Sequence, residues 1–296
     1  MKVSSFLVIC AAFFTFSGIL HTEGVPASPK SGGPSAASSQ SRFGGWNIEY
    51  TLPQGWTVAQ RAGRLQTLAS NTEAGAIFLA PGMYRNANEA IADLSQFYQL
   101  LNLQGYPMES PQSTTIAGLQ AIVATYVSTD QTGQSVQGRF ISLLTPHGTG
   151  LNALAMTTPD HMPRLRATLE RLVASVKAEP PAVNQQAVAA LAGTWVLYAG
   201  AYGGGSSVSG STAHSHEESV VFDGRGSYRW QSSSSVSVTT PGYSGGGGRA
   251  TSDADQGTYT VIDSTLVMKG TKGQFTIDFQ IQSNKLVAGG KTFLRN

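Results

Sequence analysis

The chain has little charge. Charged residues make up 12% of its 296 residues, which is about half of the usual share, and the formal net charge is +2. Neither half of the chain concentrates charge of one sign. A basic surface for nucleic acid or for an anionic membrane is therefore not expected. Hydrophobic residues make up 41%, which is enough for buried cores, and the length suits two domains of ordinary size.

Cysteine is almost absent. The single cysteine, Cys10, lies inside an apolar run at the N-terminus and follows the bulky Ile9, an unfavourable position for lipid attachment. A chain with one cysteine cannot form an internal disulfide. Without Cys10 it also has no thiolate nucleophile and no cysteine ligand for a metal. The sequence lacks a Gly-x-x-x-x-Gly-Lys phosphate loop as well, and we predict no cofactor.

The N-terminus has the pattern of an export signal. Lys2 supplies the positive charge and Val3–Phe16 the apolar core, which is short for a membrane span; an uncleaved anchor is the alternative. We expect residues 1–24 to be a signal peptide and residues 25–42, rich in Ser, Pro and Gly, to be a disordered linker. The protein is then exported, to the periplasm or out of the cell, with no stable membrane insertion once the signal is removed.

Residues 43–177 predict an α+β domain. A capping box at Asn86 and Glu89 begins the first helix, and a second helix over residues 160–176 has Pro163 in its first turn. We expect both helices on one face of an antiparallel sheet. The predicted strands cover residues 46–52, 64–70, 76–80, 114–116, 120–128, 135–145 and 151–157.

A family resemblance accompanies this pattern. The opening strand, the Leu-Pro-x-Gly-Trp turn at Leu52–Trp56 and the closing helix after a strand meander resemble the PsbP-like fold. The resemblance implies a non-catalytic binding or assembly role for residues 43–177. It carries over no functional residue, because no site motif matches position by position.

A Pro/Ala linker is predicted at residues 178–190, and residues 191–296 are then rich in short strands and tight turns. No helix pattern of useful length follows Gly193. We expect a small antiparallel up-and-down barrel, with mobile glycine-rich loops at residues 200–213 and 240–251. The predicted strands cover residues 193–198, 214–222, 227–239, 256–262, 265–269, 274–282, 285–288 and 292–294.

The second domain also resembles a known family. Its Gly-Thr-Trp entry at Gly193–Trp195 and its late Gly257-Thr258-Tyr259 strand are similar to lipocalin-like domains. Four aromatic residues are the candidates for binding a small apolar ligand inside such a barrel. The alternative is that they fill the barrel, since eight strands enclose little more than side chains. These candidates are Trp195, Tyr228, Trp230 and Tyr259.

Two patterns raise the possibility of an enzyme. His214 and His216 share one face of a strand and precede Glu217 and Glu218. Two imidazoles can bind zinc or copper, but a protein site needs a third ligand, and we predict no metal. The Gly-x-Ser-x-Gly match at residues 242–246 has no helix after it, which a nucleophile elbow requires.

The sequence leads to one main hypothesis about function. We expect an exported, non-enzymatic protein that binds a partner protein or a small apolar ligand. The first alternative is a metal-dependent enzyme outside the cytoplasm that uses His214 and His216. The second is an assembly role in which the glycine-rich loops make the contacts. Fold resemblance alone does not decide among these.

Overall fold

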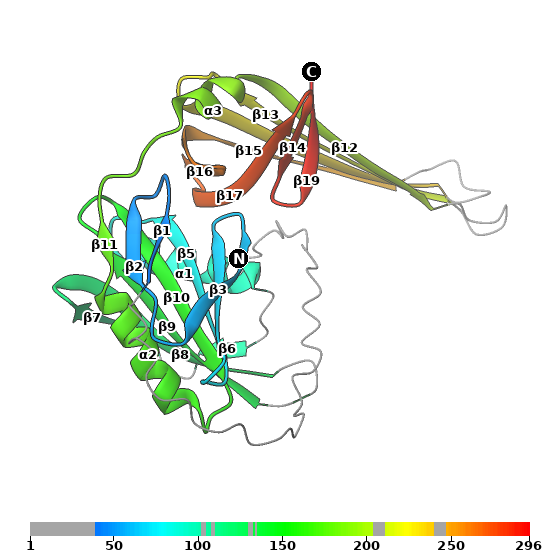
Figure 1. The fold of residues 1–296 in the computed structure, drawn as a ribbon. Helices are drawn as coiled ribbons and strands as arrows, with labels where there is room; N and C mark the ends of the chain where they lie inside the picture. The colour runs from blue at the N-terminus through cyan, green and yellow to red at the C-terminus, as the bar shows by residue number, and fades with distance from the viewer. Residues whose placement is uncertain are drawn as a thin grey trace, which may run out of the picture.

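The protein consists of an α+β domain followed by a closed eight-stranded antiparallel barrel (Figure 1). The structure, a computed structural model, describes residues 39–101, 105–107, 110–129, 133, 135–203, 211–239 and 247–296. The predicted signal peptide and most of the predicted linker before residue 43 lie outside these residues. None of the helices in the described part of the chain has the length and apolarity of a membrane span.

Two antiparallel sheets build the first domain. The large one runs in the order β3-β4-β5-β10-β9-β8-β6, with β7 also pairing β8, and the small one in the order β1-β2-β11. Strands β3 and β6 were not predicted, and β1 begins inside the predicted linker. The strands are β1 (Gln40–Phe43), β2 (Ile48–Thr51), β3 (Trp56–Ala62), β4 (Leu65–Ser70), β5 (Ala76–Met83), β6 (Gly105–Pro107), β7 (Gln112–Ile116), β8 (Leu119–Thr129), β9 (Ser135–Leu144), β10 (Thr149–Thr157) and β11 (Lys177–Ala178).

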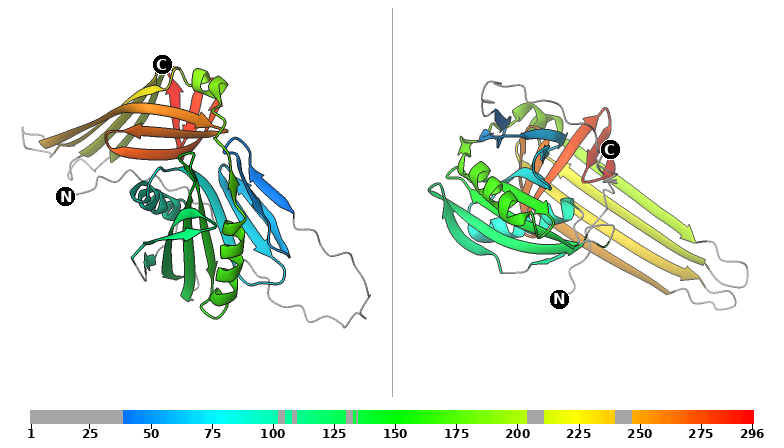
Figure 2. Two further views of the ribbon diagram at one scale, coloured as in Figure 1. Left: turned by 90° about the vertical axis from the view of Figure 1, so that its left-hand side faces the viewer. Right: turned by 60° about the horizontal axis from the view of Figure 1, so that its bottom comes forward.

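The two helices lie on opposite faces of the large sheet, so the prediction that they share one face is wrong (Figure 2). Helix α1 (Ala87–Leu100) packs Leu94 and Phe97 against alternate residues of the sheet, while α2 (Met162–Ala174) packs against the others. On β10, for example, Leu154 faces α1 and Ala153 faces α2. Strands β5 and β10, in the middle of the sheet, are buried at nearly every position because both of their faces are covered.

The barrel closes in the order β12-β13-β14-β15-β16-β17-β18-β19. Its interior is packed with large side chains, among them Phe222, Val261, Leu266 and Phe293. Every strand pairs with the next along the chain, which is the up-and-down meander that the sequence predicts. The strands are β12 (Gly193–Gly203), β13 (Ser211–Phe222), β14 (Ser227–Thr239), β15 (Gly247–Ile262), β16 (Thr265–Gly270), β17 (Gly273–Gln282), β18 (Lys285–Ala288) and β19 (Lys291–Arg295).

Four of these strands continue beyond the barrel as a flat sheet, which we call the arm (Figure 1). The arm consists of residues 197–203, 211–218, 232–239 and 247–253, which pair side by side. It begins at the row of paired residues Leu197, Glu218, Ser232 and Asp253. Parts of the predicted mobile loops at residues 200–213 and 240–251 therefore form paired strands. The middle of each loop lies outside the described residues.

The predicted linker at residues 178–190 is ordered. It begins with Ala178, the second residue of β11, and contains helix α3 (Gln185–Ala190). Asn184 caps the N-terminus of α3, because its side chain accepts a hydrogen bond from the Ala187 N–H. Val188 of α3 and the following Leu191 pack into one end of the barrel. The segment is fixed because it contributes both a sheet strand to the first domain and apolar side chains to the second.

The two domains share a packed interface. Ile262 and Val267 of the barrel belong to the apolar core of the first domain, and the Gly45 N–H donates to the Asp263 carboxylate at 2.9 Å. The buried Arg64 donates to the Pro81 carbonyl at 2.8 Å within its own domain and to the Thr276 carbonyl at 3.5 Å across the interface. Apolar burial combined with satisfied polar contacts is what a stable interface between domains requires.

Candidate functional site

The inner faces of β12 to β15 pass without a break from the barrel core into the arm. Side chains alternate along a strand, so the residues that line the core are followed by others on the same face. The register joins Trp195, Val220, Trp230 and Asp255 in one row and Leu197, Glu218, Ser232 and Asp253 in the next. The character of this face changes there from apolar to polar. We call the polar residues in and around these two rows the mouth of the barrel.

Glu218 is the centre of the mouth and is nearly buried, with 4% of its side chain exposed. Its Oε1 accepts a hydrogen bond from Trp230 Nε1 at 2.8 Å, and its Oε2 lies 2.5 Å from Lys291 Nζ. His216 Nε2 lies 3.5 Å from the same Oε2, and His216 Nδ1 lies 2.9 Å from the Ser234 hydroxyl. Both carboxylate oxygens are therefore engaged, which compensates for the removal of the charge from water.

Asp255 forms a second polar cluster beside the first. Its Oδ2 accepts from the Tyr228 hydroxyl at 2.8 Å, and its Oδ1 accepts from the Thr271 hydroxyl at 2.6 Å and the Thr271 N–H at 2.9 Å. Lys272 pairs with Asp253 and places its ammonium 5.1 Å from the centre of the Trp230 ring. This cation–π contact connects the two clusters.

The hydrogen bonds of the mouth also set its protonation states. Burial opposes ionisation of Asp255, but the hydrogen bonds from Thr271 and Tyr228 outweigh it and lower the pKa of the carboxyl below its ordinary value. Burial, together with the hydrogen bond to Asp255, raises the pKa of Tyr228 far above its ordinary value. Asp255 is thus a stable anion, and the neutral Tyr228 hydroxyl donates a hydrogen bond to it. The pair orders the mouth, and its carboxylate is already engaged and is not a free base.

The four predicted ligand-binding aromatics separate into two places. Trp195 and Tyr259 lie at the end of the barrel that α3 covers, where Trp195 Nε1 donates to the Leu191 carbonyl and the Tyr259 hydroxyl donates to the Val188 carbonyl. Tyr259 also packs edge-on against Phe222, with ring centres 4.8 Å apart. Both residues fill the core. Tyr228 and Trp230 instead take part in the polar contacts of the mouth, Tyr228 with Asp255 and Trp230 with Glu218.

The two histidines lie on the inner face of the arm, as their spacing predicts. His214 is opposite Val236 and His216 is opposite Ser234. The His216 ring is engaged by Ser234 and Glu218. Within the described ranges of the chain, no group of three His, Cys, Asp or Glu side chains is placed to hold a metal ion.

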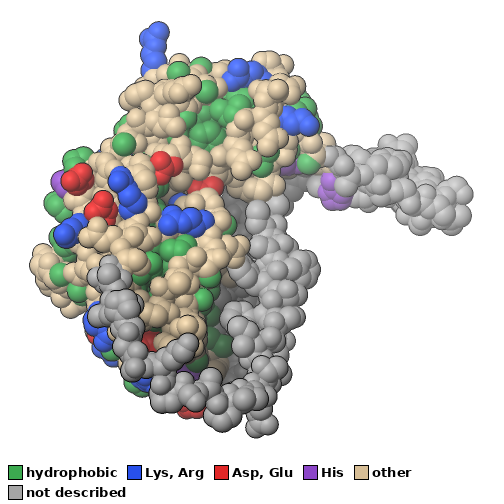
Figure 3. All heavy atoms as spheres, in the orientation of Figure 1, with side chains coloured by type: hydrophobic (Ala, Val, Ile, Leu, Met, Phe, Trp, Pro, Cys, Tyr) green, Lys and Arg blue, Asp and Glu red, His purple; other side chains and the backbone are tan. Residues whose placement is uncertain are grey.

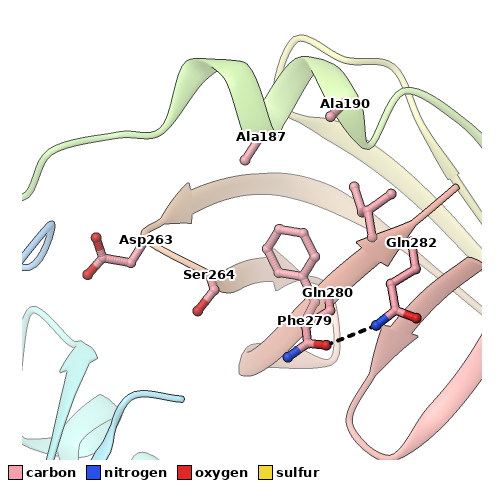
Figure 4. Close-up of a pocket in the computed structure, with 8 residues that line it drawn as sticks. Ala187, Ala190, Asp263, Ser264, Phe279, Gln280 and Gln282 are labelled. Carbon is pink, nitrogen blue, oxygen red and sulfur yellow. Dashed lines mark hydrogen bonds between the residues drawn. The ribbon is translucent and has the colours of Figure 1, made fainter.

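A shallow groove lies on the other side of the barrel, between α3 and β17 (Figure 4). Ala187 and Ala190 form one wall and Phe279 and Gln280 the other. Asp263, at one end, is the charged residue in its lining, and its carboxylate already accepts the Gly45 N–H across the domain interface. The one charged group of the groove is therefore already committed to the contact between the domains.

Sequence reasoning missed Lys291, Asp255 and Thr271, and it did not choose between Glu217 and Glu218. Strand parity contained the signal for Glu218, since residues 214, 216 and 218 share a face. No comparable signal exists for Lys291, which is 73 residues away in the chain. Closure of the barrel brings β19 next to β12 and so carries Lys291 to the mouth.

The chain matches no protein-family model, and no curated protein matches it. Several solved structures match part of it, among them the following three. The solution structure of cyanobacterial PsbP from Synechocystis sp. PCC 6803 has 13% identity and a TM-score of 0.36, and the match covers 51% of this chain and 98% of that one. LpqN, described as involved in cell envelope biogenesis of Mycobacterium tuberculosis, has 15% identity and a TM-score of 0.34, covering 49% of this chain and 86% of that one.

The third structure is a Pseudomonas aeruginosa protein of unknown function, described as a putative regulator. It has 13% identity and a TM-score of 0.31, and the match covers 48% of this chain and 98% of that one. A PsbP structure is thus among the matches, as the sequence resemblance led us to expect. At these scores and identities, none of the three structures indicates a function for this chain.

Proposed function

We propose that this chain is an exported, non-enzymatic binding protein that holds a partner protein against the inner face of its arm. The observation that carries the proposal is the continuity of this face with the barrel core. A surface that begins in a packed core and is braced by Glu218 and Lys291 at its base is preorganised, and preorganisation lowers the entropic cost of binding.

The chemistry of the face favours a polar partner surface over a small apolar ligand. Ser232, Ser234, Thr251 and Asp253 present short side chains with hydrogen-bonding groups along the strands. Interfaces between partners that associate reversibly have about the same polarity as the rest of a protein surface. The barrel interior, by contrast, is occupied by its own aromatic and aliphatic side chains.

The low charge of the protein fits recognition by shape and hydrogen bonding. The side of the molecule seen in Figure 3 carries scattered Lys, Arg, Asp and Glu side chains among uncharged polar surface. Long-range electrostatic steering of a highly charged partner therefore contributes little. Export, which this proposal includes, rests on the N-terminal sequence pattern.

Site-specific photocrosslinking in the native host tests the proposal. A photoreactive residue at Ser234 or Thr251 projects from the inner face, and one at Ser233 or Ser252 projects from the opposite face of the same strands. We expect one discrete crosslinked partner from the inner positions and none from the outer ones. Equal crosslinking from both faces, or none from either, would overturn the proposal.

A further inference from the structure

The arm has one unprotected edge. Strand β12 pairs with β19 only through Trp195 and Val196. Beyond that point, within the residues that the structure describes, Leu197–Gly203 pairs with β13 on one side and has no strand on the other. Figure 2 shows the four strands of the arm side by side, with β12 at one margin and β15 at the other.

The two margins are built differently. Exposed strand edges usually carry charges, proline or bulges that prevent pairing with another chain. The β15 margin has such protection: it contains Arg249, Asp253 and Asp255, and the turn at Thr271 and Lys272 contacts it. The β12 margin reads Leu-Tyr-Ala-Gly-Ala-Tyr-Gly and contains neither a charge nor a proline.

The central five residues of the open stretch, Tyr198–Tyr202, have a symmetric sequence. Leu197–Gly203 has Gly200 in the middle, flanked by Ala199 and Ala201 and then by Tyr198 and Tyr202. Two copies of a strand that pair antiparallel about a two-fold axis place each residue opposite its mirror position. An axis at Gly200 would place Tyr198 opposite position 202 of the second copy and Ala199 opposite position 201.

We propose that two copies of this chain associate through antiparallel pairing of their β12 edges, with the two-fold axis at Gly200. Three independent features agree on this occupant: the length of the free edge, its lack of protecting residues and the symmetry of its sequence. Tyr198, 71% exposed in the single chain, gains a cross-strand neighbour in the dimer. The pairing joins two four-stranded arms into one eight-stranded sheet, and both inner faces lie on the same side of it.

This association does not depend on a bound partner, so it can be tested on the purified full chain. Sedimentation velocity over a series of protein concentrations should show a monomer–dimer equilibrium for the wild type. Gly200→Lys and Gly200→Asp should each abolish the dimer, because a residue on the axis faces its own copy and like charges repel. An equimolar mixture of the two variants should restore dimers, because opposite charges then meet.

A cysteine at the same position gives a second measurement. In a Cys10→Ser background, Gly200→Cys is the only thiol of the chain, and directly opposed residues of an antiparallel pair are close enough for a disulfide. We expect rapid disulfide-linked dimers from Gly200→Cys and none from Ser233→Cys, which lies on an internal strand. A wild type that stays monomeric, a dimer that survives both charge variants, or a failure of their mixture to associate would overturn the proposal.

Discussion

Glu218 illustrates, at the scale of single residues, how the mouth is stabilised. Its carboxylate is almost removed from water and is compensated by Trp230 Nε1 and Lys291 Nζ. A buried pair of this kind adds little net stability relative to apolar residues of the same shape, but breaking it leaves an uncompensated charge. The pair therefore fixes geometry at the base of the arm.

A double-mutant cycle should measure this coupling. Glu218→Gln keeps an acceptor for Trp230 but removes the charge, and Lys291→Met keeps the apolar stem. We expect each single variant to lower the free energy of unfolding by about 3 kcal/mol. The loss in the double variant should be smaller than the sum of the two single losses by about 0.5–3 kcal/mol. Urea unfolding provides the measurement. Glu217→Gln, exposed on the other face, should change little; strictly additive costs for Glu218 and Lys291 would contradict the coupling.

Helix α3 shows how a short element is kept in place. Six residues are too few for a helix to be stable alone, so α3 depends on its cap and on the packing of Val188. Asn184 supplies the cap and also donates through its side chain to the Asp263 carbonyl at 3.3 Å. The cap thus holds the helix and the β15–β16 turn together.

Replacement of the Asn184 cap should destabilise the protein. Asn184→Ala is expected to lower the free energy of unfolding by about 0.5–2 kcal/mol, because the Ala187 N–H loses its acceptor. Gln185→Ala, one residue further and exposed, should be neutral because alanine favours the helix. Thermal unfolding followed by circular dichroism compares the two. Equal stability of both variants would show that the cap contributes nothing.

At the scale of the whole molecule, the interface makes the two domains one mechanical unit. Gly45 is central to it, because its N–H donates to both oxygens of the Asp263 carboxylate. A Cβ at position 45 would lie 2.5 Å from Asp263 Oδ1, whereas one at position 44 would have its nearest neighbour at 3.7 Å. Two adjacent glycines therefore provide a matched pair.

We expect Gly45→Ala to uncouple the domains and Gly44→Ala to leave them joined. The clash of the new Cβ with Asp263 should cost about 1–3 kcal/mol, as overpacking in a tight contact does. This cost weakens the interface between the domains. Scanning calorimetry should show one cooperative transition for the wild type and for Gly44→Ala, and two separated transitions for Gly45→Ala. A single unshifted transition for Gly45→Ala would mean that the interface does not couple the domains.

Local patterns determined much of this protein. Alternation and turn residues predict most strands of both domains, the capping box at Asn86 and Glu89 predicts the start of α1, and the meander predicts the barrel. These features were predictable because they depend on neighbours a few residues apart. The β3 strand was missed because its end, residues 59–62, is exposed and lacks apolar alternation.

Tertiary structure decided the rest. Which sheet face each helix covers, the meeting of Glu218 with Lys291, and the fusion of the domains through Gly45 and Asp263 all join residues that are far apart in the chain. No local periodicity encodes such pairs, because they arise only when the sheet is layered and the barrel closes. The open edge at Leu197–Gly203 belongs to both levels. Its symmetry is in the sequence, but its lack of a neighbour appears only where β12 leaves β19.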